Sequence, residues 1–261
     1  MLEVLKVAAM GVLQGVTEFL PVSSSGHLVL AKHFFGIKSS GPSLEIFLHS
    51  GTLVTIIIFY RRKLWDLITG IFQLERMSIL YALWVLFSMV PVFILHIFTG
   101  NVLVKSYGSP IIVASMLCLT GVFLLSSIFI NNNKDKERPF TWQDSMIMSL
   151  AQALALLPGI SRSGITIYSG RLAGVKPEDA AEFSFIMSLP VMFGAIILDL
   201  LKGGPGDVSM PACFTGAIVA ALTGCISISA LIKILNSGKL WVFGIYCLVA
   251  GIISSLLIYL L

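Results

Sequence analysis

Residues 77–104 read MSILYALWVLFSMVPVFILHIFTGNVLV and contain no Asp, Glu, Lys or Arg. A helix needs roughly 20 apolar residues to cross the hydrocarbon core of a bilayer, so this stretch is long enough to span. Residues 106–133, 208–232 and 240–261 are further runs without a charge. The 261-residue chain is 57% hydrophobic and 11% charged, with a mean hydropathy of +0.96, whereas soluble domains carry about 25% charged residues. The sequence therefore predicts an all-α polytopic membrane protein.

The remaining composition excludes several classes of function. The net charge is +4, and no basic block is long enough to bind nucleic acid. The four cysteines stand singly in apolar stretches without metal-ligand spacing, at positions 118, 213, 225 and 247. We therefore expect the lipid bilayer, and no nucleic acid, to be the main partner of the chain. The oligomeric state stays open, with a homodimer among the options.

Six segments are predicted to span the membrane, namely 43–60, 79–99, 109–130, 181–201, 211–235 and 240–260. Short cytoplasmic loops concentrate Lys and Arg. Residues 61–63 read RRK, and Lys134, Lys136 and Arg138 follow the third segment, so both of these loops are predicted to lie inside. The loop near Lys105, the turn at 203–206 and both termini are then predicted to lie outside.

Two apolar stretches, 1–40 and 142–175, are each broken midway by small polar residues. The breaks read PVSSSGH at 21–27 and PGISRSG at 158–164. Backbone that is not helical is tolerated at membrane depth only where protein or a watery cavity satisfies it. These stretches are therefore predicted to form two re-entrant helix–loop–helix hairpins.

The two breaks superpose when the sequence is shifted by 138 residues. Gln14 then falls on Gln152, and Ser23, Ser25 and Gly26 fall on Ser161, Ser163 and Gly164, which makes four identities in thirteen positions. Glu45 and Glu182 also correspond, at a shift of 137. The alternative is that Ser and Gly simply recur, as in any polytopic protein. A true repeat makes one membrane domain, 1–261, from halves at about 1–130 and 142–261. Because each half then has three spans, the halves insert in opposite senses, and the hairpin tips are predicted to meet near the midplane.

Glu18 stands in the apolar stretch just before the first break, and Arg162 stands at the tip of the second hairpin. An ionisable group at bilayer depth is costly and marks a candidate functional site. One interpretation is structural, with Glu18 and Arg162 forming an ion pair that holds the two halves together. The other is catalytic. Gln14 stands four residues before Glu18 and therefore shares its helix face.

Serines precede a short helix predicted to begin near His27, and the Ser-Arg-Ser-Gly segment has the same character in the second half. Free backbone N–H groups at a helix start, together with an arginine, favour phosphate oxygens. The predicted phosphate-binding residues are Ser23, Ser25, Gly26, Ser161, Ser163, Gly164 and Thr166.

Further residues at the breaks could add catalysis to binding. The Glu18 carboxylate, with Gln14 as a second candidate ligand, could hold Mg²⁺ or Ca²⁺ against the phosphate. His27 could attack the phosphorus, or could activate Ser24 or a water. Taken alone, His27 could equally be a helix-cap residue. His49 lies one turn after Glu45 and could therefore line the site, but nothing else in the sequence supports that role.

The segments QGVTEFLPVSSSGH at 14–27 and PGISRSGIT at 158–166 resemble the two signature motifs of the undecaprenyl pyrophosphate phosphatases of the bacitracin-resistance type. The resemblance extends over the whole chain in length and segment order, and includes the EFSF stretch at 182–185. It implies an enzyme of the cytoplasmic (inner) membrane that removes the terminal phosphate of undecaprenyl pyrophosphate on the outer, periplasmic face. This reaction recycles the lipid carrier for peptidoglycan synthesis and confers bacitracin resistance.

Carried over by position, the resemblance implies that Gln14 and Glu18 form the acidic motif. It places Ser24 and His27 in the Ser/His segment and makes Arg162 the phosphate-binding arginine. Gln14 departs from the family pattern, because many members have a second Glu there, so a metal site with two carboxylates is in doubt. Whether Ser24 or His27 is the nucleophile stays open. The rival is a secondary transporter or lipid flippase, because inverted repeats and broken helices are also the plan of such proteins.

Overall fold

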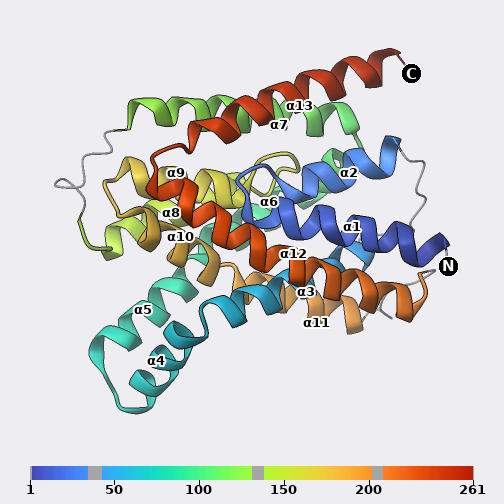
Figure 1. The fold of residues 1–261 in the computed structure, drawn as a ribbon. Coiled ribbons are helices and arrows are strands. Elements are labelled where there is room, and N and C mark those ends of the chain that lie inside the picture. The colour runs from blue at the N-terminus through green and yellow to red at the C-terminus, as the bar shows by residue number, and fades with distance from the viewer. Residues whose placement is uncertain (1, 35–42, 131–137, 202–207, 261) are drawn as a thin grey trace.

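The computed structural model describes residues 2–34, 43–130, 138–201 and 208–260, and these are helical throughout apart from short connections (Figure 1). The first half contains α1 Leu2–Phe19, α2 Ser24–Phe34, α3 Ser43–Phe59, α4 Arg61–Phe72, α5 Arg76–Phe87, α6 Met89–Tyr107 and α7 Pro110–Leu125, followed by a 3₁₀ turn at Ser126–Phe129. The second half contains α8 Trp142–Leu154, α9 Arg162–Leu172, α10 Pro177–Ile186, α11 Leu189–Leu201, α12 Met210–Asn236 and α13 Trp241–Leu260. The predicted all-α class is confirmed.

All six predicted spans have a counterpart among the described helices. Five helical stretches are long and apolar enough to cross a membrane, at Arg76–Gly100, Pro110–Phe129, Pro177–Leu201, Met210–Asn236 and Trp241–Leu260. The sixth, α3, passes the test together with α4, from which it is bent by 73°. The chain is a multi-pass membrane protein.

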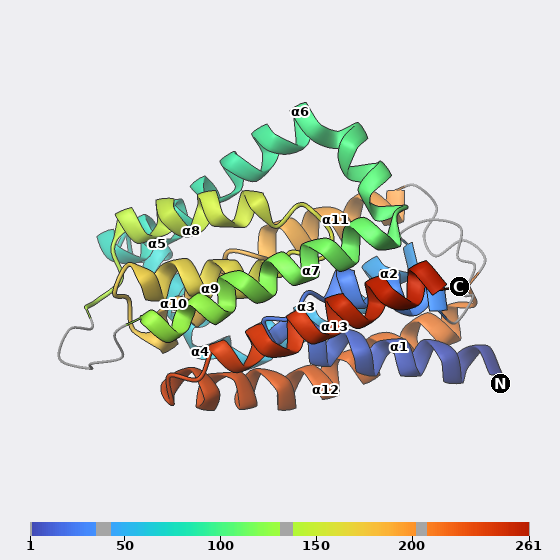
Figure 2. The same ribbon diagram turned by 90° about the horizontal axis from the view of Figure 1, so that it is seen from above.

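The connections divide between the two ends of the helix bundle as the charge pattern predicts. Figure 1 shows the start of α1 and the end of α13 at one end, and the junction of α3 with α4 at the other, where the second half also begins. The turn between α6 and α7 lies at the end that carries the termini, as Figure 2 shows. Lys105 lies in the last turn of α6, next to the short connection at Gly108 and Ser109. Lys134, Lys136 and the turn at 203–206 are outside the described residues.

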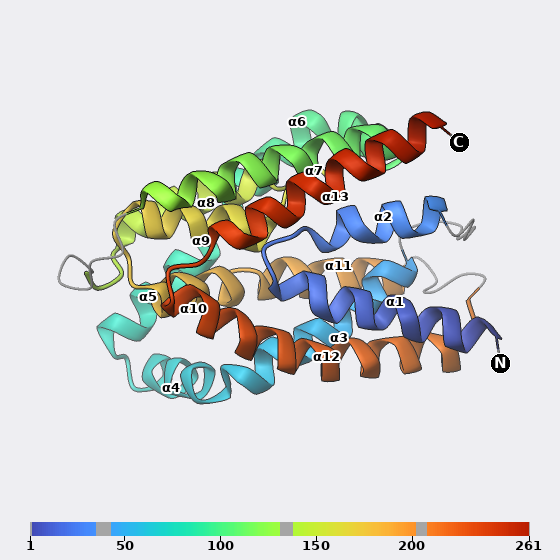
Figure 3. The same cartoon turned by 45° about the horizontal axis from the view of Figure 1, so that its top comes forward.

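The two predicted hairpins are present and approach each other from opposite ends of the bundle. Figure 3 shows α1 and α2 at the end with the termini, α8 and α9 at the other end, and the breaks of both hairpins between them. One boundary differs from the expectation, since α2 begins at Ser24 and not near His27. The Ser23 hydroxyl accepts a hydrogen bond from the Gly26 backbone amide at 3.3 Å, so capping begins at the first serine of the run.

Small residues let the first hairpin sit close against one span, and let two of the spans sit close against each other. Helix α1 packs along α12, and a Cβ added at Gly15 would lie 2.4 Å from the Ala220 carbonyl oxygen. The contact between α7 and α13 is equally close, with an added Cβ at Gly121 2.9 Å from the Gly244 carbonyl oxygen. Contacts of this kind are typical of membrane helices. In lipid the hydrophobic effect does not drive helices together, and small residues allow the close van der Waals packing that does. They fix α1, and with it Glu18, against the bundle.

A charged cap fixes the start of the second hairpin. Asp144 is fully buried and forms a capping box with Thr141. The two terminal guanidinium nitrogens of Arg138 donate to the two oxygens of the Asp144 carboxylate, at 2.6 and 2.7 Å. Burial works to raise the pKa of Asp144, but the hydrogen bonds from Arg138 and Thr141 outweigh it, so the pKa lies below its usual range.

We expect Asp144→Asn to lower the stability of the protein at neutral pH by about 1–3 kcal/mol, since a cap and charge-assisted hydrogen bonds are lost. Because the folded pKa is depressed, the carboxylate stabilises the fold above its unfolded pKa of about 3.9. This stabilisation disappears as the pH falls through the lower folded value. Thermal unfolding in detergent should therefore show a difference between wild type and Asp144→Asn at pH 7 that shrinks near pH 3. Asp66→Asn, at an exposed carboxyl on α4, should match wild type at both pH values.

Candidate functional site

The tips of the two hairpins are in direct contact at the centre of the bundle. An added Cβ at Gly26 would lie 3.1 Å from the Gly159 Cα, and one at Gly164 would lie 3.2 Å from the Pro21 Cβ. The Ser23 hydroxyl donates to the Ile160 carbonyl at 3.5 Å. Gly159 has a φ of +98°, which a residue with a side chain rarely adopts, and its carbonyl accepts from Thr120 at 3.0 Å. The predicted meeting of the two breaks is therefore confirmed.

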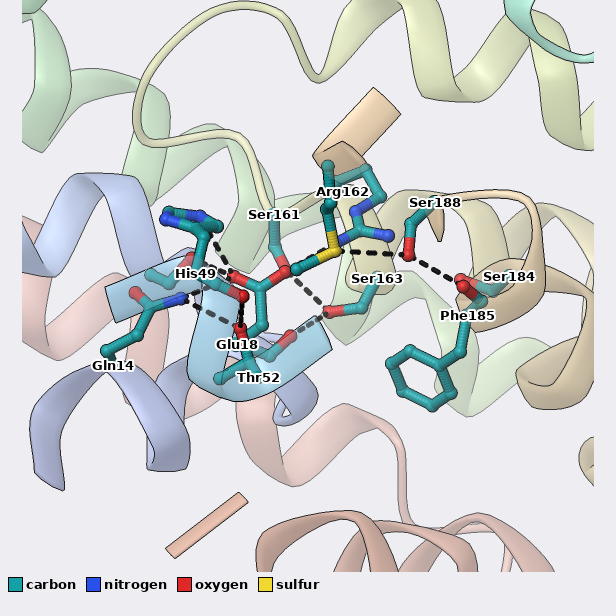
Figure 4. A network of polar contacts seen from close by, with 12 residues as sticks. Gln14, Glu18, His49, Thr52, Ser161, Arg162, Ser163, Ser184, Phe185 and Ser188 are labelled. Atoms are coloured by element: carbon teal, nitrogen blue, oxygen red, sulfur yellow. Dashed lines mark hydrogen bonds and ion pairs between the residues drawn. The ribbon is translucent and has the colours of Figure 1, made fainter. Parts of the chain in front are cut away.

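Glu18 is the centre of the polar network at this contact, as Figure 4 shows. Its Oε1 accepts a hydrogen bond from Arg162 Nη2, which joins the two halves by an ion pair. Its Oε2 accepts from the Ser24 hydroxyl at 2.5 Å. The Glu18 side chain is 5% exposed and that of Arg162 is 21% exposed, so this pair is largely withdrawn from solvent.

The Arg162 guanidinium is not fully used by this pairing. Its Nη1 is buried and has no hydrogen-bond partner among the residues that the structure describes. A buried donor without an acceptor is costly, and guanidinium forks match phosphate oxygens in geometry and charge. The structure thus contains the Glu18–Arg162 ion pair that could hold the two halves together. It also contains a free hydrogen-bond donor, Arg162 Nη1, that can bind an anion.

Gln14 of α1 and His49 of α3 lie beside the other oxygen of Glu18, and Thr52 of α3 contacts Gln14. The Gln14 amide nitrogen donates to Glu18 Oε2 at 3.2 Å and to the Thr52 hydroxyl at 3.4 Å. The Gln14 amide oxygen is buried without a partner. The His49 Nε2 lies 3.5 Å from Glu18 Oε2. These contacts place Gln14 on the same side of the site as Glu18, as the helical spacing predicts.

The second tip supplies a helix start to the same region. Ser161 is the N-cap of α9, and its hydroxyl accepts from the Gly164 amide at 3.1 Å. The Ser163 hydroxyl donates to the Glu18 backbone carbonyl at 3.4 Å. Thr166 is engaged elsewhere, because its hydroxyl donates to the Arg162 carbonyl at 2.7 Å and contacts the Ser184 hydroxyl of α10 at 2.7 Å.

His27 is turned toward α13. Its Nδ1 lies 2.8 Å from the Ser23 carbonyl oxygen, which can only accept, so Nδ1 carries a hydrogen. Its Nε2 lies 2.8 Å from the Tyr246 hydroxyl, and the two rings stack with centroids 5.6 Å apart. The described contacts of His27 therefore include neither Glu18, Ser24 nor Arg162.

This arrangement can be compared with known proteins. The model of the family described as bacitracin resistance protein BacA matches residues 7–253. The chain belongs to this family. It is 38% identical to the undecaprenyl-diphosphatase of Methanococcus vannielii over 243 residues, which cover 93% of this chain and 96% of that protein. It is 36% identical to the undecaprenyl-diphosphatase of Halothermothrix orenii, with 98% of each chain covered. The undecaprenyl-diphosphatase of Bacteroides fragilis is 34% identical, with 94% of each chain covered. The resemblance drawn from the two motifs is confirmed.

Few side chains at this site of the BacA family member could act as ligands of a cation. Among the described residues, no group of three or more His, Cys, Asp and Glu side chains could hold a metal ion. The Glu18 carboxylate and the Gln14 amide oxygen are donors of the kind that a hard cation prefers, but in the structure it is the Gln14 nitrogen that faces Glu18.

Three residues beside the BacA signature segments do not stand out in the sequence. His49 and Thr52 reach Glu18 and Gln14 from α3, and Tyr246 reaches His27 from α13. Their positions depend on packing between helices that are far apart in sequence. The one available signal is the spacing of Glu45, His49 and Thr52, which places them on one helix face.

Proposed function

We propose that this chain hydrolyses undecaprenyl pyrophosphate to undecaprenyl phosphate and inorganic phosphate, and that the reaction occurs where the hairpin tips meet. The observation that carries the proposal is the buried Glu18–Arg162 pair, because it brings a carboxylate, a hydroxyl and an unused guanidinium nitrogen together. Membership of the BacA family supports the same chemistry, since its relatives are named undecaprenyl-diphosphatases. Hydrolysis of the substrate recycles the lipid carrier for peptidoglycan synthesis.

Ser24 is the group that we assign to nucleophilic attack. Its hydroxyl already donates to Glu18 at 2.5 Å, which is the nucleophile–base contact expected of an activated hydroxyl. Ser24 Oγ passes its proton to Glu18 and bonds to the terminal phosphorus, while the bond from that phosphorus to the bridging oxygen breaks. Undecaprenyl phosphate leaves, and water then releases inorganic phosphate from the serine. His27 is assigned to orienting the first turn of α2, because its ring is held by Ser23 and Tyr246.

Arg162 and the α9 N-terminus bind the phosphate oxygens. The free Nη1 of Arg162 supplies one hydrogen bond, and the amides near Ser161, Ser163 and Gly164 supply a positive helix end. Thr166 is assigned to supporting this helix through Ser184. A divalent cation, Mg²⁺ or Ca²⁺, held by Glu18 and Gln14 would offset the charge of the diphosphate.

The test is product analysis with the purified protein in detergent, where no gradient or second compartment exists. We expect one inorganic phosphate per lipid and an undecaprenyl monophosphate product. A secondary transporter or flippase needs binding groups but no nucleophile, so binding of the lipid without release of phosphate would favour that rival.

We further propose that the site faces the periplasmic side of the cytoplasmic membrane. The positive-inside rule supports this orientation of the bundle, because α4, which begins with Arg61, Arg62 and Lys63, lies at the end opposite the termini. All assigned residues come from one chain, so the proposal does not depend on a homodimer.

The orientation predicts the labelling of single cysteines placed in a background without the native four. A cysteine replacing Gly108, at the end of α6, should react with an impermeant thiol reagent in intact cells. One replacing the exposed Ser237, at the end of α12, should react only after the cells are opened. The reverse pattern would invert the orientation.

A further inference from the structure

His49 is the residue at the site that neither the sequence motifs nor the catalytic assignments use. It lies in the second turn of α3, and its ring faces the Glu18 carboxylate in Figure 4. The side chain is 28% exposed, and Nε2 is 3.5 Å from Glu18 Oε2. This is the edge of the site at which the cation is proposed to bind.

The hydrogen bond on the other side of the ring fixes which nitrogen carries the hydrogen. His49 Nδ1 lies 2.7 Å from the Glu45 backbone carbonyl oxygen. A carbonyl oxygen can only accept, so Nδ1 is the donor. In the neutral imidazole, Nε2 then presents a lone pair toward Glu18 Oε2. Two lone pairs that face each other are stabilised by a positive species between them, which is either a proton on Nε2 or a metal cation.

A third lone pair belongs to the same region. The Gln14 amide oxygen is buried, Gln14 itself has no exposed surface, and no group in the described part of the chain hydrogen-bonds this oxygen. Its amide nitrogen lies 3.2 Å from Glu18 Oε2. Rotation of the amide by half a turn would bring the oxygen toward the position that the nitrogen now holds, beside the carboxylate.

We infer that His49 is a nitrogen ligand of the divalent cation, together with Glu18 and Gln14. This inference rests on the proposed function, in which a cation binds beside Glu18, and it adds a ligand and a metal preference. Neighbouring ligands of an octahedral ion with bonds of about 2.1 Å are about 3 Å apart, which the distance between His49 Nε2 and Glu18 Oε2 approaches. A metal-bound histidine normally donates its other N–H to a carbonyl or carboxylate, as His49 does to Glu45.

The inferred ligand set determines which cations bind well. Carboxylate, carbonyl and water oxygens suit Mg²⁺, Ca²⁺ and Mn²⁺ alike. An imidazole adds affinity for first-row transition metals, of which Mn²⁺ binds most weakly, and adds little for Mg²⁺ or Ca²⁺. The imidazole also supplies an additional metal ligand at a site where Gln14 stands in place of a second carboxylate. We therefore expect the protein to bind Mn²⁺ more tightly than Mg²⁺ or Ca²⁺, with His49 responsible for the difference.

The experiment uses Mn²⁺ as the probe and needs no substrate. Pulsed electron paramagnetic resonance on the purified full-length protein in detergent should show imidazole-nitrogen modulation of the bound Mn²⁺. Labelling the histidines with ¹⁵N should change the modulation frequencies without any mutation. His49→Gln should remove the modulation and weaken Mn²⁺ binding by about tenfold or more, with little effect on Mg²⁺. His33→Gln, on the exposed side of α2, is the matched control and should leave the signal intact.

The possible results separate this inference from the proposed function. Modulation that persists in His49→Gln, or that is absent from wild type, would overturn the role of His49 even if phosphate is released. Modulation that depends on both His49 and Glu18, in a protein that releases no phosphate, would support the ligand assignment and reject the proposed hydrolysis.

Discussion

Glu18→Gln should reduce the rate of phosphate release by at least about 10²–10³-fold, the loss expected when a positioned catalytic group is removed. The substitution keeps the size of the side chain but removes the negative charge. The amide can no longer accept the Ser24 proton or hold a cation as a carboxylate does, and it weakens the pairing with Arg162. The measurement is the initial rate of phosphate release in detergent at several Mg²⁺ and Ca²⁺ concentrations. The residual activity of the variant should not respond to the cation.

Glu75→Gln is the matched control for this substitution, because Glu75 is an exposed carboxylate in the turn before α5. It should retain the wild-type rate and the wild-type response to cations. A Glu18→Gln protein that keeps most of its activity would show that the carboxylate is needed only for the contact between the two halves.

Arg162→Ala should raise KM and lower kcat, because the guanidinium contacts the diphosphate both before and during phosphoryl transfer. Loss of a cationic group that stabilises this transition state costs about 10³–10⁵-fold in rate. Arg162→Lys should restore little activity, since it keeps the charge but loses the planar fork. The measurement is a full dependence of rate on lipid concentration for the three proteins.

The alanine variant also leaves Glu18 buried without its partner, which is a strongly destabilising change. Arg162→Lys separates the two effects, because it keeps a positive charge beside the carboxylate. Arg62→Ala, at an exposed position in α4, should behave as wild type in both respects. If Arg162→Ala folds and hydrolyses the lipid at the wild-type rate, the ion pair is structural and the phosphate lies elsewhere.

The architecture could be predicted from the sequence because the bilayer imposes strong constraints on it. Runs without charge locate the spans, and polar breaks in apolar stretches locate the hairpins. The contact between Glu18 and Arg162 could also be predicted, since the repeat brings both breaks to one place. Helix α4 was not expected, because an amphipathic helix at the end of a span carries no long apolar run.

The finer geometry of the site could not be predicted, because it depends on side-chain directions between separate helices. His27 lies within three residues of Ser24 in sequence, yet its ring is held by Tyr246 of α13, 219 residues away. Thr166 belongs to the second signature segment, yet its hydroxyl is used by Ser184. His49 stands outside both segments and still reaches Glu18. Proximity to a motif in sequence is therefore a weaker guide than the face of the helix on which a residue stands.

The central claim is that Glu18 of the first hairpin and Arg162 of the second act on one phosphate group. A double-mutant cycle of kcat/KM tests this most directly, with the conservative variants Glu18→Asp and Arg162→Lys chosen to leave measurable activity. Residues that act as a unit are strongly non-additive, whereas independent sites multiply their losses. We expect the double variant to be little worse than the poorer single variant. If the loss in the double variant equals the product of the two single losses, the two hairpins do not form one active site.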